Sequence, residues 1–183
     1  EDHEDFAVLH LDAHADLRDS YEGFEWSHAS IMHNVVKKIP HVSKLVQVGI
    51  RDFSKAEAEM IASSEGRIVT HYDWRLAERK ADGQSWGAIC DAIIEDLPNW
   101  VYVSFDIDGL DPAFCPSTGT PVPGGLSFNE ACLLLKRVVD SGVTIVGFDL
   151  NEVAPGANGN EWDANVGARV LYKLCSWMLK SWE

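Results

Sequence analysis

Long apolar runs are absent from this sequence, and none approaches the roughly 20 residues that a membrane-spanning helix needs. Internal repeats, low-complexity segments and linkers rich in Ser or Gly are absent too, which argues against a modular array or a multidomain chain. The chain has 183 residues, 46% of them hydrophobic, which is enough to bury one sizeable core. We therefore expect residues 1–183 to form a single domain.

Cysteine is scarce, and the four cysteines stand far apart. They show neither the C-x-x-C spacing of many metal and redox sites nor the density of a disulfide scaffold. The four are Cys90, Cys115, Cys132 and Cys175. This usage is typical of a reducing compartment, so we expect a cytoplasmic protein whose thiols are buried.

Basic residues are outnumbered by acidic ones, 15 to 29, which gives a net charge of −14. A nucleic-acid backbone or an anionic membrane surface would be repelled, so we expect no nucleic acid and no membrane as the main partner. A cation, whether a metal ion or a small substrate, fits this charge better.

The sequence does contain short β-branched runs that alternate with longer segments of helical spacing. We expect strands at 6–12, 45–50, 67–72, 100–107 and 144–150. We expect helices at 28–38, 55–63 and 85–96, after the capping box at 127–130, and at 162–180, with Val166, Val170, Leu171 and Leu174 on one side. The pattern predicts an α/β fold, a three-layer αβα sandwich with a mostly parallel sheet.

Acidic residues follow three of the expected strands. Asp12 ends the first strand, Asp106 and Asp108 end the fourth, and Asp149 and Glu152 end the last. Because the carboxyl ends of parallel strands meet at one edge of a sheet, we expect these side chains to gather there. That edge is also where such folds bind their ligands.

Two of these sequences have the spacing of metal ligands. In the D-x-H-x-D sequence of Asp12, His14 and Asp16, alternation along an extended chain can aim three ligands at one spot. Asp106 and Asp108 share a face in the same way. A divalent cation removes the repulsion among such carboxylates. Oxygen ligands favour Mn²⁺ or Mg²⁺ over structural Zn²⁺. Because there are more carboxylates than one ion requires, the set suggests two ions. Taken alone, the D-x-H-x-D sequence is also compatible with a solvated turn.

His28 stands at the expected start of a helix, downstream of the acidic sequence. Histidine as a residue type exchanges protons near neutral pH, so His28 is a candidate proton donor, although a histidine at such a position is often structural. His33, His41 and His71 have no comparable context, and we interpret them as ordinary surface or core residues.

Five motifs resemble those of the ureohydrolase family, the arginases, agmatinases and their relatives, and look most like agmatinases. They are LDAHADLRD (11–19), SHAS (27–30), SFDIDGLDPAFCPSTGTPVPGGLS (104–127), GFDLNEVAP (147–155) and NVGARVLYKL (165–174). They occur in family order and span nearly the whole chain, and the long central block is far more specific than a chance D-x-D. The resemblance implies the arginase/deacetylase-like version of the three-layer fold.

The resemblance also implies a centre of two Mn²⁺ ions that hydrolyses a guanidino group to urea and an amine, with the water between the ions as nucleophile. By position, Asp12 and Asp106 would bridge the two ions. Asp16 would complete the first metal site, and His14 and Asp108 would complete the second.

Three residues take catalytic roles by the same resemblance. Asp16 would orient the nucleophile, His28 would pass protons to the departing amine, and Glu152 would pair with the guanidinium of a small cationic substrate. The resemblance further implies a homo-oligomer, either a trimer or a hexamer.

One departure concerns a further histidine ligand of the first ion, which the family supplies from a GGDH-type loop upstream of the DAHAD sequence. No such loop is present, and His3 is a poor substitute. The chain also starts without Met. We therefore expect it to be roughly the C-terminal two-thirds of a longer catalytic domain, lacking the N-terminal part; a targeting signal upstream stays open.

The segment before His28, DSYEGFEWSH, bears on the substrate. Glu22 and Glu25 would repel the α-carboxylate of arginine, whereas agmatine has none, so we expect an agmatinase that releases urea and putrescine. Two alternatives stay open: an arginase or another guanidino or formimino hydrolase, and a non-catalytic homologue acting as a binding or regulatory subunit, which the missing histidine motivates. A one-zinc deacetylase site is disfavoured, because Asp16 supplies a carboxylate for a second metal.

Overall fold

A five-stranded parallel sheet forms the centre of the molecule. The computed structural model describes residues 5–183. The strands are β1 (Phe6–Leu11), β2 (Val42–Ile50), β3 (Ile68–Tyr72), β4 (Trp100–Asp106) and β5 (Thr144–Asn151). They lie in the order β3-β2-β1-β4-β5, and every neighbouring pair is parallel. The parallel sheet and its five strands confirm the expectation from the sequence.

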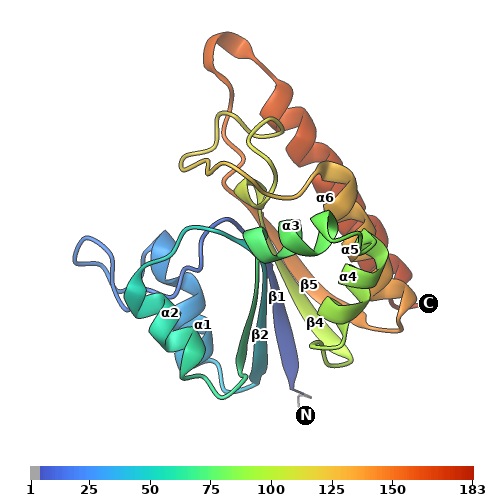
Figure 1. Cartoon of the computed structure of the whole chain (residues 1–183). Helices are drawn as coiled ribbons and strands as arrows, with labels where there is room; N and C mark the ends of the chain where they lie inside the picture. Colours follow the sequence, from blue (N-terminus) through green and yellow to red (C-terminus); the bar gives the residue numbers. More distant parts are fainter. Residues whose placement is uncertain (1–4) are drawn as a thin grey trace.

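Helices cover both faces of this sheet. They are α1 (Ile31–Lys38), α2 (Lys55–Ala62), α3 (Asp73–Ala81), α4 (Trp86–Ile94), α5 (Phe128–Asp140) and α6 (Trp162–Lys180), with 3₁₀ turns η1 (His28–Ser30), η2 (Ile107–Gly109) and η3 (Ala157–Gly159). Helices α1 and α2 lie on one face and α4, α5 and α6 on the other, which makes the predicted three layers (Figure 1). Among the described helices, none is long and apolar enough to cross a membrane.

Local sequence explains where several helices begin. Ser54 and Ser127 each accept a hydrogen bond from the third helical residue, and the glutamate at that residue reaches back to the serine N–H, which completes two capping boxes. Helix α3 was absent from the predicted set. It buries only Leu76 and has no side-chain N-cap, so neither an apolar stripe nor a capping residue announces it.

The two faces of the sheet carry separate apolar clusters. Neighbouring residues of β1 point to opposite sides, so Val8 packs with Met32 and Val36 of α1, while Leu9 packs with Leu134 of α5 in the larger cluster. Both layers of helices are therefore anchored by the same strands. The central strand is buried from both sides, which leaves its carboxyl end as the place where polar side chains emerge.

Two expectations about burial were wrong in part. Val166 and Val170 are buried with Leu174, but Leu171 is 44% exposed, because it lies about 100° further round the helix than Val170. The cysteines are free, and only two of them are buried. Cys90 and Cys115 are buried, Cys132 is half-buried and Cys175 is exposed.

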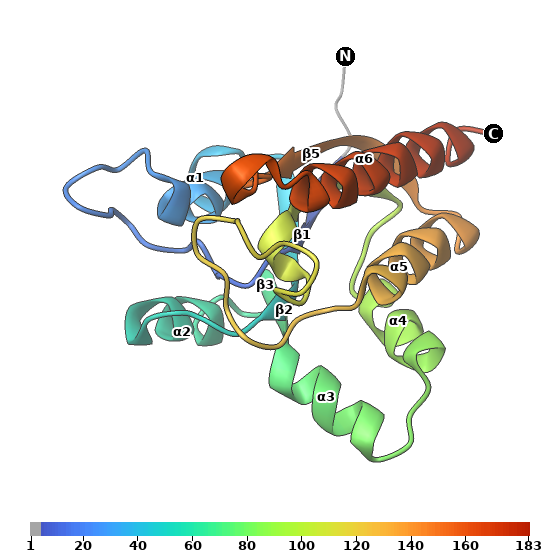
Figure 2. The same cartoon turned by 90° about the horizontal axis from the view of Figure 1, so that it is seen from above.

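After β1 the chain continues toward one edge of the sheet, and after β4 it continues toward the opposite edge. From β1 it proceeds through β2 to β3, and it then returns to β4 and β5 on the other side of β1. Such a switch point leaves a crevice at the carboxyl ends of the strands, where open α/β sheets bind ligands. The loop of residues 110–127 lies over these strand ends (Figure 2). Arg51 fastens it, since Nη2 donates to the carbonyls of Asp108, Leu110 and Val122.

Candidate metal centre

The seven site residues expected from the sequence come together at this switch point. Four lie in the segment between β1 and α1, two lie at the end of β4, and one follows β5. All seven line one cavity of about 400 Å³. They are Asp12, His14, Asp16, His28, Asp106, Asp108 and Glu152.

Asp12, His14 and Asp108 form one tight group. His14 Nδ1 is 3.1 Å from Asp108 Oδ2 and 3.4 Å from Asp12 Oδ1. One ligand atom from each residue lies within 4.8 Å of the others. The Ala13 N–H donates to Asp108 Oδ1 at 3.0 Å, which ties η2 to the end of β1. A Cβ atom at Gly109 would lie 2.8 Å from the Asp12 nitrogen, so glycine is required for this close approach.

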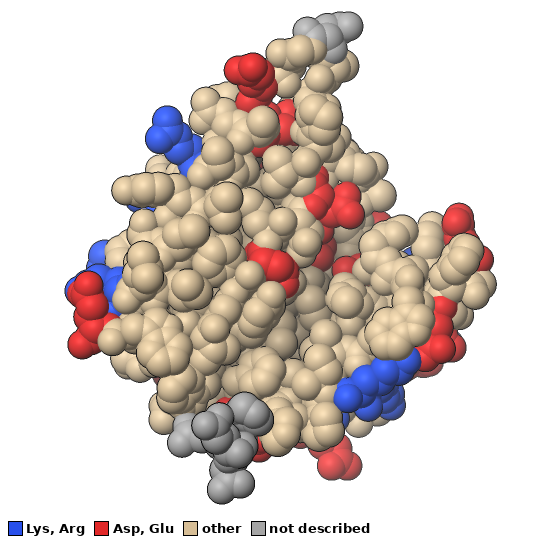
Figure 3. Space-filling model, turned by 180° about the vertical axis from the view of Figure 1, so that it is seen from behind, with Lys and Arg blue, Asp and Glu red and all other residues tan. Residues whose placement is uncertain are grey.

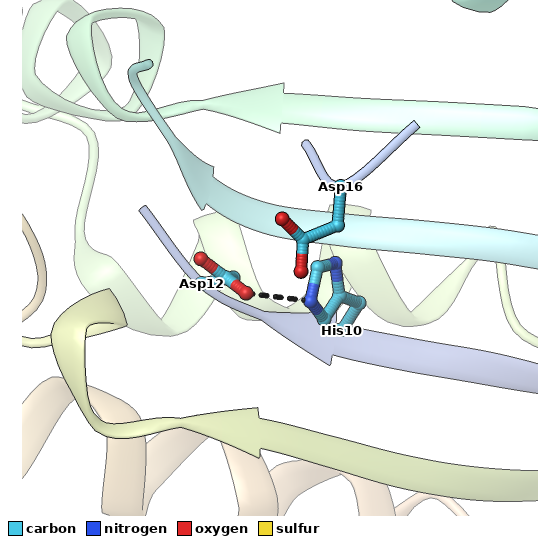
Figure 4. A group of neighbouring side chains, drawn as sticks. All are labelled: His10, Asp12 and Asp16. Atoms are coloured by element: carbon cyan, nitrogen blue, oxygen red, sulfur yellow. Dashed lines mark hydrogen bonds and ion pairs between the residues drawn. The ribbon is translucent and has the colours of Figure 1, made fainter. Parts of the chain in front are cut away.

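A second group shares Asp12. His10 Nε2 lies 2.8 Å from Asp12 Oδ2, and the Asp16 carboxylate faces the same region (Figure 4). One ligand atom from each of the three residues lies within 4.8 Å of the others. Asp12 therefore belongs to both groups, as a bridging ligand would. Among the described residues Asp106 belongs to neither group; its Oδ1 accepts a hydrogen bond from the Asp108 N–H at 3.0 Å.

The protein groups alone leave negative charge uncompensated. Burial and then the Asp12 carboxylate raise the pKa of Asp16 to about 8. Burial, Asp12 and Asp108 raise the pKa of Asp106 to about 9. Burial acts to lower the pKa of His14, but hydrogen bonds to Asp108 and Asp12 raise it to about 10. The cluster therefore holds protons that a cation would displace.

Asp16 is held in a strained conformation. Its φ of 54° lies in the left-handed region, which residues other than glycine seldom adopt. Its carbonyl accepts from the N–H groups of Met32 and His33 at the start of α1, and the next N–H, that of Leu17, donates to Glu57 of α2 at 3.0 Å. Such strain persists where surrounding contacts fix it, and it is concentrated at functional sites.

His28 and Glu152 are exposed at the rim of the cavity. The His28 ring packs edge-on against Tyr21, with ring centroids 5.4 Å apart. Glu152 also has a left-handed φ, of 58°, and its carbonyl accepts from Thr118 Oγ1 at 3.0 Å. The loop over the strand ends thus helps to orient the residue that follows β5.

A second cavity, of about 610 Å³, meets the first one at the shared side chains Asp12, Asp16, His28, Asp106 and Glu152. With Asp149, five acidic residues line it, and among the described residues no Lys or Arg does. On the face drawn in Figure 3, acidic side chains lie near the middle as well as at the edges, whereas Lys and Arg lie toward the edges. The larger cavity is therefore suited to a cationic molecule.

Sequence reasoning missed one member of the groups, His10. It lies two residues before Asp12 on an extended chain, so the spacing already placed both side chains on one face. Glu22 and Glu25, by contrast, are not among the described residues that line either cavity, and Glu25 pairs with Lys38. His3 lies outside the described residues.

The donor set fits two hard divalent cations. Carboxylate oxygens dominate both groups, the His14 imidazole completes one of them, and Asp12 is common to both. The raised pKa values of Asp16 and Asp106 show charge that the protein does not balance by itself. The assignment of individual ligands stays a prediction.

Comparison with known proteins agrees with this geometry. A sequence profile described as the arginase family matches residues 1–176. This chain belongs to the arginase family. It is 37% identical over 181 residues to proclavaminate amidinohydrolase from Streptomyces clavuligerus, covering 94% of this chain and 55% of that protein. It is 36% identical over 169 residues to N(1)-aminopropylagmatine ureohydrolase from Thermus thermophilus, covering 92% and 52%.

Solved structures share the arginase-family fold. The Streptomyces proclavaminate amidinohydrolase superposes with a TM-score of 0.79 at 29% identity, over 97% of this chain and 56% of that chain. An agmatine ureohydrolase from Thermoplasma volcanium superposes with a TM-score of 0.77 at 26% identity, over 97% of this chain and 56% of that chain. The resemblance and the three-layer fold inferred from the sequence are thereby confirmed. The chain spans about half the length of the curated relatives it matches.

Proposed function

We propose that this arginase-family chain carries the centre of a binuclear manganese hydrolase, which cleaves a guanidino group to urea and an amine. The observation that carries the proposal is the convergence of seven residues from three separate segments of the chain on one cavity. Two acidic groups that share Asp12 are the arrangement that a pair of ions needs. Relatives named as an amidinohydrolase and as ureohydrolases support the same class of reaction.

In this proposal Asp12 and Asp106 bridge the two ions, Asp16 completes the first site, and His14 and Asp108 complete the second. When bound, two divalent cations lower the pKa of a water molecule so that it can attack a guanidino carbon near neutral pH. Binding of the ions displaces the protons that Asp16, Asp106 and His14 otherwise hold. Manganese suits a set of this kind, rich in oxygen with some imidazole.

Three side chains act on the substrate and its nucleophile. The Glu152 carboxylate accepts charge-assisted hydrogen bonds from the guanidinium and orients it. Asp16 accepts a hydrogen bond from the attacking water. His28 gives a proton to the departing amine nitrogen, and Tyr21, which packs against its ring, restricts the directions in which that proton can be delivered.

Agmatine is the substrate that we propose, and the larger cavity supports it better than the glutamates that first suggested it. Glu25 is paired with Lys38, so the ammonium of Lys38 compensates much of its negative charge. The 610 Å³ cavity, by contrast, is lined by five acidic residues and by no described Lys or Arg. Four of these acids are assigned to the ions and the guanidinium, which leaves Asp149 as a counter-ion for the amine of agmatine. The cavity offers no cationic side chain for the α-carboxylate of arginine.

Urea release by the full-length protein loaded with Mn²⁺ tests the proposal. The substrates compared are agmatine, arginine, guanidinobutyrate and aminopropylagmatine, with the amine product identified by chromatography. We expect the highest kcat/KM with agmatine. A higher value with another guanidino compound would keep the reaction and replace the substrate. Two bound Mn²⁺ ions without urea from any substrate would favour a binding or regulatory homologue instead.

A further inference from the structure

A row of polar residues crosses the whole sheet one step below the candidate metal centre. Each strand contributes one residue, and neighbouring members are paired in the strand register. From one edge to the other they are Thr70, Gln47, His10, Ser104 and Asp149. Polar groups of this kind are costly in the middle of a sheet unless their hydrogen bonds are satisfied. The presence of this polar row in the sheet therefore requires a physical explanation.

The half of the row behind Asp12 is connected by hydrogen bonds. Thr70 Oγ1 donates to Gln47 Oε1 at 3.0 Å, and Gln47 Nε2 lies 3.1 Å from His10 Nδ1. His10 Nε2 lies 2.8 Å from Asp12 Oδ2. Gln47 and His10 are 0% and 1% exposed, so water does not compete for these bonds. The connection runs from β3 through β2 and β1 to a proposed bridging ligand.

The direction of each bond follows from one backbone contact. Gln47 Nε2 also donates to the Ala15 carbonyl at 2.8 Å, and because a carbonyl can only accept, the amide nitrogen must face that side. The same nitrogen therefore presents an N–H to His10 Nδ1, which accepts. The hydrogen on the imidazole then lies at Nε2 and is donated to Asp12.

Gln47 consequently has hydrogen bonds that act on both ends of the D-x-H-x-D sequence from Asp12 to Asp16. Through His10 it orients Asp12, and through the carbonyl of Ala15 it restrains the residue that directly precedes Asp16. With both ring nitrogens engaged, His10 is occupied as a hydrogen-bond partner and has no nitrogen left for an ion. Partners of this kind orient metal ligands in many metalloproteins.

We propose that Gln47 and His10 are positioning residues, which set the bridging orientation of Asp12 and the turn at Asp16 through hydrogen bonds from the second strand. The inference rests on the proposed binuclear centre. It adds that the affinity for the ions is set in part from β2, by a residue that touches neither an ion nor the substrate.

Binding of Mn²⁺ alone tests the inference, with the metal-depleted full-length protein followed by calorimetry and by electron paramagnetic resonance. Gln47→Met and His10→Phe keep most of the volume but remove the donors. We expect Mn²⁺ affinity to fall by about 10- to 100-fold and the spectrum of coupled Mn²⁺ pairs to weaken. His10→Gln keeps a side-chain N–H at a similar reach and should restore most of the affinity.

A matched control is available on the neighbouring strand. His71 follows Thr70 in β3 and bonds a carboxylate, Asp96, outside the ligand groups. His71→Phe should therefore leave Mn²⁺ binding unchanged. If Gln47→Met or His10→Phe fails to fold, Thr70→Val removes only the outermost donor and should weaken binding less than either of them.

The possible results separate the two proposals. Natural affinity in Gln47→Met, His10→Phe and Thr70→Val would overturn the positioning role while leaving the metal centre intact. Loss of binding in His10→Gln equal to that in His10→Phe would make His10 a direct ligand and would also overturn it. Failure of the natural protein to bind Mn²⁺ would remove the centre itself and the inference with it.

Discussion

The two halves of the segment between β1 and α1 are held in different ways. Residues 12–17 are largely buried, and their backbone is bonded to groups from β2, α2 and η2. Residues 19–27 are mostly exposed, with Phe24 and Trp26 at 67% and 70%. Their contacts are local: Tyr21 and Phe24 bond each other's backbone, and Lys38 of the following helix pairs with Glu25 and lies over Trp26.

This difference suggests a division of labour. A proposed metal site needs fixed ligand geometry, and the first half is fixed by parts of the chain that are distant in sequence. The second half ends at His28 and borders the cavity where a substrate would enter, and it is held mainly by its own neighbours. Changes in the first half should alter metal binding and stability, whereas changes in the second should alter turnover.

The largest effect is expected from the fixed half and its partner strand. Asp12→Ala and Asp108→Ala each remove a carboxylate from the shared ligand group, so bound Mn²⁺ and urea production should both be lost. Metal content by mass spectrometry and urea assays check this. Asp19→Ala removes an exposed acid from the same segment and should retain both. Normal turnover in either ligand variant would contradict the binuclear assignment.

The next effect is expected from the end of the exposed half. His28→Ala should leave the Mn²⁺ content intact and slow turnover by about 10²- to 10⁴-fold, the usual contribution of a general acid. Metal analysis and kcat of the same preparation check it. His41→Ala, ahead of β2 and outside both cavities among the described residues, is the control. Loss of metal instead of turnover would identify His28 as a ligand.

A moderate effect on stability is expected when chelators remove the metal. A carboxyl whose pKa is raised on folding keeps its proton where the unfolded chain has lost it, so stability falls as pH rises. Asp16 and Asp106, with pKa values of about 8 and 9, act in this way. The raised pKa of His14 stabilises the folded state fully at pH values below its usual pKa of 6.5. This contribution is lost as the pH rises through about 10.

The metal-free protein should therefore lose stability between pH 6.5 and 9. Denaturant unfolding at several pH values measures the free energy of unfolding. Asp16→Asn should flatten this dependence, because it removes one of the groups that titrate, and an excess of Mn²⁺ should also reduce it. Greater stability at pH 9 than at pH 6.5 in the chelated protein would rule out this account of the cluster.

The smallest effect is expected within the exposed half. Glu25→Gln removes an exposed ion pair with Lys38, so the free energy of unfolding should change by less than about 1 kcal/mol. The preference for agmatine over arginine should also persist, because Glu25 does not line the cavity. Steady-state kinetics with both substrates check it, with Glu22→Gln as the matched variant. A large gain in arginine hydrolysis would restore the glutamates as specificity residues.

Much of the fold was readable from the sequence because parallel strands buried on both faces appear as continuous apolar runs. The exceptions have local causes. Strand β2 begins at Val42, before its apolar run, and includes the exposed Ser43 and the ion-paired Lys44. Helix α3 escaped prediction because it is polar and buries only Leu76.

The sequence by itself determined which acidic and imidazole side chains gather and the edge of the sheet where they lie. Acids that follow strands must converge once the strands are parallel, so the positions from Asp12 to Glu152 were predictable together. The tertiary structure alone decided which residues distant in sequence become neighbours: the register that sets Gln47 beside His10, and the approach of Asp108 to the Ala13 N–H. Such pairings depend on contacts between distant segments, which no local pattern encodes.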